Sequence, residues 1–137
     1  MLIDSNILVY AINSRSPKHK PAQNFLQENI RELIVAHQNI FETLRVLTHP
    51  KFPSPLSVHN AIEEIKRITN ACRVIAPDYK THYMTFELIK KYNLSSDLIF
   101  DAYLAATALS NGITTIATDN TKDFQRFEIT LINPFKE

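Results

Sequence analysis

The chain has 137 residues, 45% of them hydrophobic, and a formal net charge of +1 at pH 7, so we expect one globular domain over residues 1–137 whose total charge does not indicate nucleic-acid binding. The single cysteine, Cys72, excludes an intramolecular disulfide and a cysteine zinc cluster and is typical of the cytoplasm, and no apolar run reaches the roughly 20 residues that a membrane span needs. The single glycine, Gly112, excludes glycine-rich phosphate loops and the dinucleotide fingerprint, because both need several glycines.

The first half of the chain alternates apolar runs with amphipathic stretches. Residues 2–12 predict a buried strand that runs into a turn, and the apolar core of this strand lies past Asp4. The next segments are predicted, in order, as a helix at 21–29, a strand at 33–36, a helix at 38–47, a proline-rich connector at 50–55 and a helix at 57–71 capped by Ser57. The apolar faces expected for the last two helices are Ile40, Phe41, Leu44 and Leu47, and Ala61, Ile62, Ile65 and Ile68.

The second half continues the alternation. We predict a strand at 73–75, helices at 81–92 and 96–110, a strand at 114–118 and a last short strand at 129–132. Gly112 follows the alanine-rich helix as its stop signal, since glycine adopts the left-handed conformation freely. Because the strands are continuous apolar runs separated by helices, the sequence predicts an α/β fold: a three-layer α/β/α sandwich around a central parallel sheet of four to five short strands.

Four acidic residues stand where functional groups collect in such a sheet. Parallel sheets place functional groups at the carboxyl ends of their strands. Asp4 lies in or after the first strand, Glu42 on the helix after the second, Asp101 near the start of the alanine-rich helix, and Asp119 directly after the strand at 114–118. We therefore expect these four carboxylates to meet at one edge of the sheet.

Each acid also has a structural interpretation. Glu42 stands between apolar neighbours, where an unpaired carboxylate is costly, and an ion pair with Arg45 or Lys51 is the alternative to a functional role. Asp97 and Asp101 are four residues apart near a helix N-terminus, where the helix dipole favours acids by roughly 0.3–1 kcal/mol. For Asp97 the two interpretations stay open, whereas small neighbours around Asp101 favour function.

Gathered carboxylates repel one another, and a divalent cation removes that conflict. Each carboxylate raises the pKa of its neighbours, and hard oxygen ligands suit Mg²⁺ or Mn²⁺. No close pair of ligand type occurs among the histidines, which are His19, His37, His49, His59 and His82. A carboxylate-held Mg²⁺ is a common device for phosphodiester chemistry, because the metal orients a water, helps to deprotonate it and stabilises charge on the phosphate.

At this point the sequence resembles the PIN-domain nucleases, most closely the VapC-like toxins of type II toxin–antitoxin systems. The resemblance covers essentially the whole chain and rests on DSN at Asp4, the helix that carries Glu42, FDAYLAATA around Asp101 and ATDN at Asp119. It implies that these four acids form the pocket, with Asp4 and Asp101 as principal metal ligands. Ser5 and Asn6 would be auxiliary pocket residues, and Asp97 an auxiliary candidate at a variable position.

The resemblance further implies an Mg²⁺- or Mn²⁺-dependent endoribonuclease, the toxin of a toxin–antitoxin pair, which cleaves RNA with a metal-activated water. The substrate would be tRNA, rRNA or mRNA, the inhibitor a cognate antitoxin protein, and the assembly a homodimer. An acidic pocket repels RNA, so basic residues near its rim must contact the backbone. The candidates for this role are Arg15, Lys18, Lys20, Arg45 and Lys51.

Three other functions compete with this one. A receiver domain needs an acidic pair after its first strand, and an Asp-x-Asp phosphatase needs an acid where Asn6 stands. Neither pattern is present. A non-catalytic PIN-like module that binds RNA or a protein stays open, and only a cleavage assay separates it from the nuclease.

Overall fold

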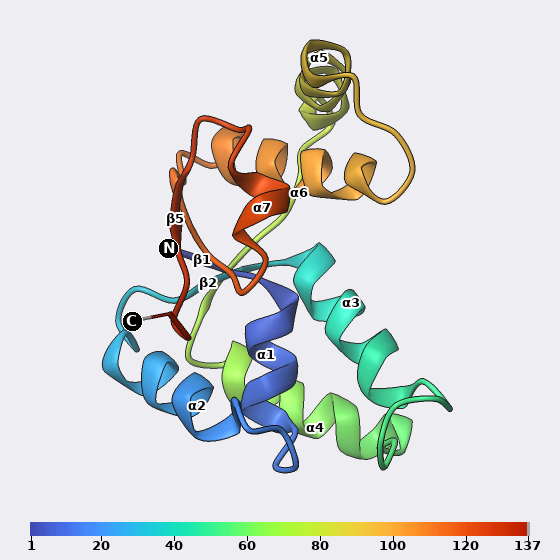
Figure 1. Cartoon of the computed structure of the whole chain (residues 1–137), viewed down its shortest axis with the longest axis vertical. Helices are drawn as coiled ribbons and strands as arrows, with labels where there is room; N and C mark the ends of the chain where they lie inside the picture. The colour runs from blue at the N-terminus through green and yellow to red at the C-terminus, as the bar shows by residue number, and fades with distance from the viewer. Residues whose placement is uncertain (137) are drawn as a thin grey trace.

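A computed structural model describes residues 1–136, which build one five-stranded sheet (Figure 1). The strands lie in the order β3-β2-β1-β4-β5 and every neighbouring pair is parallel. Their bounds are Leu2–Ile3 for β1, Ile34–Ala36 for β2, Arg73–Ile75 for β3, Thr115–Ala117 for β4 and Thr130–Ile132 for β5. The predicted parallel sheet is therefore confirmed.

Helices cover both faces of this sheet. Their bounds are Ser5–Ile12 for α1, His19–Glu28 for α2, His37–Thr48 for α3, Val58–Thr69 for α4, Thr81–Tyr92 for α5, Leu98–Ser110 for α6 and Thr121–Phe124 for α7. Figure 1 shows α5, α6 and α7 on one side of the strands and α1 to α4 on the other. No helix among residues 1–136 is long and apolar enough to cross a bilayer.

Alternation along the strands produces two hydrophobic cores. Leu2 and Ile116 pack with the small residues of α6, whereas Ile3 and Ala117 pack with α1 and α2. Successive strand residues point to opposite faces, so even the two-residue β1 contributes to both cores. This division confirms the predicted three-layer sandwich.

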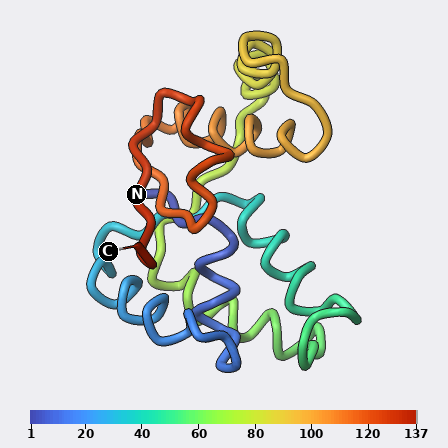
Figure 2. Tube along the Cα trace, viewed as in Figure 1, coloured from blue at the N-terminus to red at the C-terminus, as the bar shows by residue number. Residues whose placement is uncertain are grey.

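The order of the strands creates a switch point in the centre of the sheet. The chain runs outward from β1 through β2 to β3, and then returns to add β4 on the other side of β1 (Figure 2). In the register between these strands, Ile3 lies opposite Ala117. Asp4 and Thr118, the residues that follow, therefore emerge side by side at the carboxyl edge, where ligands bind in open parallel sheets.

The prediction of a strand through residues 7–9 is wrong. After Ile3 the chain turns at once into α1, and Asp4 caps this helix by accepting a hydrogen bond from the Ser5 amide. Residues Ile7, Leu8 and Ala11 then face the core at helical spacing. A short apolar run is compatible with both a strand and a helix, and here Asp4 as an N-cap favours the helix.

Two residues predicted for apolar helix faces lie outside the core. Phe41 is 64% exposed and Ile62 is 37% exposed. On α3 the predicted Leu47 is buried, and the other buried positions belong to Asn39 and Thr43. Asn39 belongs inside because its side-chain oxygen accepts a hydrogen bond from the Ala36 amide at 3.0 Å, which joins the end of β2 to the start of α3.

Candidate active site

Asp4 is the most deeply held acid of the switch point, with only 9% of its surface exposed. Its carboxylate accepts hydrogen bonds from Thr118 Oγ1 at 2.7 Å, from the Ser5 amide at 2.8 Å and from Asn6 Nδ2 at 3.4 Å. These donors come from the residue after β4 and from the first turn of α1. The carboxylate is therefore fixed in position from several sides.

Ser5 joins Glu42 to this group. The Ser5 hydroxyl donates to Glu42 Oε1 at 3.1 Å and accepts from Asn39 Nδ2 at 3.3 Å. Within residues 1–136, neither Arg45 nor Lys51 forms an ion pair with Glu42. The described residues therefore do not form the ion pair that was the alternative to a functional role. Glu42 lies instead beside Ser5, next to the other acids.

The electrostatics of Asp4 reflect this crowding. Burial raises the pKa of Asp4 from 3.8 to about 6, against the opposing effect of the hydrogen bonds from Thr118 and Ser5. Repulsion from Glu42 and Asp123 raises this pKa further. The hydrogen bonds therefore do not compensate for burial, and the ionised carboxylate lacks charge compensation.

Asp101 shares the same field from α6. Burial raises the pKa of Asp101 from 3.8 to about 7, repulsion from Asp123, Asp4 and Glu42 adds to the rise, and Arg126 opposes it. The Asp101 side chain forms no hydrogen bond with any residue in the described part of the chain. Its carboxylate oxygens are thus available for a ligand.

Asp119, the fourth predicted acid, has different partners. Its carboxylate accepts a hydrogen bond from Tyr10 at 3.0 Å and pairs with Lys18 Nζ at 2.5 Å, and these contacts lower its pKa against the effect of burial. Lys18 Nζ also lies 5.3 Å from the centre of the Phe135 ring. The Asp119 backbone still touches the site, because its amide donates to Asn6 Oδ1 at 3.3 Å.

Two residues of this site were not predicted as functional. Asp123, on the short helix α7, raises the pKa values of both Asp4 and Asp101. The sequence signal for its placement is the apolar residue that follows it, Phe124. In the structure Phe124 is 2% exposed and anchors α7 against the core. Thr118 offered no signal, because a threonine at a strand end is typical of any sheet.

The acid set fits a hydrated magnesium ion better than a closed metal cage. Among residues 1–136, no three histidine, cysteine, aspartate or glutamate side chains are arranged to hold a metal ion by themselves. Mg²⁺ does not need such a cage, because it keeps several waters and uses one or two carboxylates together with substrate phosphates. Asp4 and Asp101, with raised pKa values and no paired cation, have the donor chemistry of that kind of site.

The sequence profile of the PIN domain family matches residues 1–129. The chain belongs to the PIN domain family. It is 26% identical over 133 residues to Ribonuclease VapC37 of Mycobacterium tuberculosis, which covers 93% of this chain and 91% of that protein. This relative, together with the family match, confirms the predicted resemblance to VapC-like PIN domains.

Solved structures share the fold of this PIN domain. FitAcB from Neisseria gonorrhoeae matches with a TM-score of 0.74 and 18% sequence identity, and the match covers 99% of each chain. VapBC2 from Rickettsia felis, bound to a DNA fragment from their promoter, matches with a TM-score of 0.73 and 18% identity over 96% of each chain. These matches show that the fold is shared over 96% to 99% of the chain.

The remaining predicted site residues of this PIN domain lie at its surface. Asp97 is exposed directly before α6, and its side chain makes no capping hydrogen bond. Lys18 forms the ion pair with Asp119 described above. The other predicted RNA contacts are exposed, and they are Arg15, Lys20, Arg45 and Lys51.

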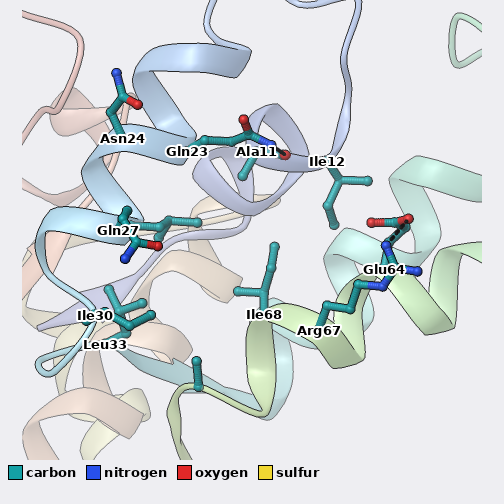
Figure 3. A pocket seen from close by; sticks show the side chains of 12 residues that line it. Ala11, Ile12, Gln23, Asn24, Gln27, Ile30, Leu33, Glu64, Arg67 and Ile68 are labelled. Carbon is teal, nitrogen blue, oxygen red and sulfur yellow. Dashed lines mark hydrogen bonds and ion pairs between the residues drawn. The ribbon is translucent and has the colours of Figure 1, made fainter.

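A separate groove lies between α1, α2 and α4 (Figure 3). Figure 3 shows amide side chains such as Gln23 and Gln27 on one wall and Ile68 on another, with the ion pair of Arg67 and Glu64 at its edge. None of the four predicted acids lines this groove. Its groups offer hydrogen bonds and apolar contact but not the acid cluster that phosphodiester hydrolysis needs.

Proposed function

We propose that this PIN domain is a divalent-metal-dependent endoribonuclease and the toxin of a toxin–antitoxin pair. The observation that carries the proposal is the placement of Asp4 and Asp101 at the switch point, where burial and repulsion from neighbouring carboxylates raise both pKa values. A bound divalent cation stabilises two such carboxylates, whereas an anion would be repelled by them. Family membership supports the nuclease assignment, and the name of the relative VapC37 supports RNA as the substrate.

In this proposal Asp4 and Asp101 hold Mg²⁺ or Mn²⁺, and Glu42 and Asp123 complete the negative field around it. When bound, the cation lowers the pKa of a water and stabilises charge on the phosphate. Glu42 accepts a hydrogen bond from the Ser5 hydroxyl, which fixes the Ser5 oxygen next to the acid Asp4 that would hold the cation. Fixed hydrogen bonds to Asp4 keep its ligand oxygens in place through the reaction.

The side chain of Asp119 has a supporting role rather than a ligand role. Its carboxylate is already engaged by Lys18 and Tyr10, and its amide orients Asn6 toward Asp4 and Thr118. Asn6 Nδ2 contacts both Asp4 Oδ2 and Thr118 Oγ1. We therefore propose that Asp119 positions Asn6 through its backbone amide, and we assign metal binding to Asp4 and Asp101.

Partners follow from the same assignment. A toxin–antitoxin complex from Klebsiella pneumoniae shares the fold with a TM-score of 0.72 and 18% identity, which supports a cognate antitoxin for this chain. We further propose that the chain forms a homodimer and acts in the cytoplasm on tRNA, rRNA or mRNA. Co-purification with the product of an adjacent small reading frame tests the antitoxin, and light scattering tests the dimer.

A cleavage assay tests the nuclease assignment. Purified protein should cut RNA with Mg²⁺ or Mn²⁺ and lose activity in excess chelator. Asp4→Asn and Asp101→Asn should lose cleavage while keeping the fold by circular dichroism, and the matched control Asp97→Asn, one turn away and exposed, should retain it. Binding of RNA without cleavage by the wild-type protein would instead establish the non-catalytic module.

A further inference from the structure

A basic and aromatic surface lies beyond the acid site, at the end of α3. Arg45, His49, Lys51 and Phe52 line one hollow there. Phe52 is shared with an adjoining hollow that contains Arg15. Among residues 1–136, no acidic side chain lines either hollow. We call Arg15, Arg45, His49, Lys51 and Phe52 the basic rim.

Within the described chain, the basic rim gathers cations without acids between them. Among the described residues, Arg15, Arg45 and Lys51 form no ion pair, as is true of most basic side chains here. What distinguishes the rim is that these cations line two adjoining hollows without a described acidic residue, on a chain whose net charge is only +1. Such a cluster is stabilised by an external anion.

The basic rim is continuous with the acid site through α3. Arg45 lies one helical turn after Glu42, and His49 caps the C-terminal end of the same helix. With a rise of about 1.5 Å per residue, they lie about 5 Å and 10 Å from Glu42 along the axis. A polyanion whose reacting phosphate sits beside Glu42 therefore has its next phosphates within reach of these cations.

Phe52 and His49 add features that a plain salt surface lacks. Phe52 is half-buried, with one part packed against the cluster of Leu47 and Ala61 and another lining the hollows. His49 Nδ1 accepts the Lys51 amide at 3.0 Å, which leaves the proton on Nε2 as a donor. A fixed aromatic ring among cations is the arrangement that binds single-stranded nucleic acid by stacking and phosphate contact.

We infer that the basic rim is a subsite for single-stranded RNA that flanks the cleaved bond, with Arg45 and Lys51 on phosphates and Phe52 stacked on a base. This inference rests on the proposed nuclease function, because it uses the acid site to locate the reacting phosphate. The subsite positions substrate and takes no part in proton transfer.

Binding is measured by fluorescence anisotropy with labelled single-stranded RNA of about 12 nucleotides, in chelator and on an Asp101→Asn background that prevents cleavage. Arg45→Gln/Lys51→Gln should lower the slope of log affinity against log salt by about 1.4, since each phosphate contact on a single strand contributes about 0.7. Phe52→Leu should weaken binding at least about fivefold. The matched control is Lys80→Gln/Lys90→Gln, since Lys90 also lies in the last turn of a helix and α5 is at the opposite end of the molecule (Figure 1).

Cleavage separates the failure of this inference from the failure of the proposed function. With an active wild-type protein, the double variant should raise KM and leave kcat unchanged. Equal KM and equal salt slopes for this variant and its control would overturn the subsite and leave the nuclease intact. Tighter binding to duplex DNA, or equal displacement by polyglutamate, would overturn RNA as its ligand. Binding that depends on the rim without any cleavage would keep the subsite and refute the nuclease.

Discussion

Asp101→Asn should make the metal-free protein more stable at alkaline pH. In the folded protein the pKa of this carboxyl is raised from 3.8 to about 7, so the ionised form is disfavoured by folding. The stability linked to its protonated form is fully present below 3.8 and is lost as the pH rises through about 7. Asparagine stays neutral and avoids this loss.

The magnitude follows from the shift. A rise of about 3 units at 1.36 kcal/mol per unit sets an upper limit of roughly 4 kcal/mol. Asp101 is partly exposed, and solvent screening reduces this limit to about 1–3 kcal/mol. Asp101 forms no side-chain hydrogen bond with the described residues, so the substitution breaks no bond that would mask the gain.

Urea unfolding in excess chelator measures the effect near pH 8 and near pH 4. We expect Asp101→Asn to exceed wild type near pH 8 and to match it near pH 4, with Asp97→Asn equal to wild type at both. Added Mg²⁺ should stabilise wild type more than Asp101→Asn. A variant that is no more stable near pH 8, or a gain that does not depend on pH, would refute the reasoning that burial and neighbouring carboxylates destabilise the ionised form of Asp101.

Two further substitutions test the roles assigned to other residues. Asp119→Asn should retain most RNA cleavage and cost at most about 1 kcal/mol of stability, because it removes a partly exposed ion pair with Lys18; a loss of cleavage as complete as that of Asp101→Asn would return Asp119 to the metal ligands. Ser57→Ala should lower the free energy of unfolding in urea by about 1 kcal/mol, because it removes the cap on the Asn60 amide of α4. Ser57→Thr, which keeps the acceptor oxygen, should unfold close to wild type, and an unchanged Ser57→Ala protein would contradict the capping role.

The fold was predictable because most segments carry one dominant signal. β3 and α5 have the predicted bounds, since a β-branched pair and an amphipathic repeat leave no competing period. The apolar run at residues 2–12 fits both a strand and a helix, and the helix that forms there is capped by Asp4. The hydrophobic pattern therefore predicts an element well where it fits only one period, and fails where the same residues fit both a strand and a helix.

The site was predictable in its location and less so in its members. Strand ends and helix starts place Asp4, Glu42 and Asp101 at one edge, as parallel topology requires. The spacing does not reveal which way an acid points after it leaves a strand. Asp119 turns to Lys18, a partner 101 residues away, while Asp123 is directed by the helix that Phe124 anchors. These contacts depend on tertiary packing and carry no local signature.

The candidate site of this PIN domain is built directly on the central strands of its sheet. Asp4 is the residue after β1, and Thr118, its closest hydrogen-bond donor, is the residue after β4. Their contact at 2.7 Å exists only in the register that pairs Ile3 with Ala117. Because the buried charge of Asp4 opposes folding and a cation would relieve it, metal binding should strengthen this strand pairing as well as enable chemistry. A central strand of two residues is thus enough to bring Asp4 to the switch point.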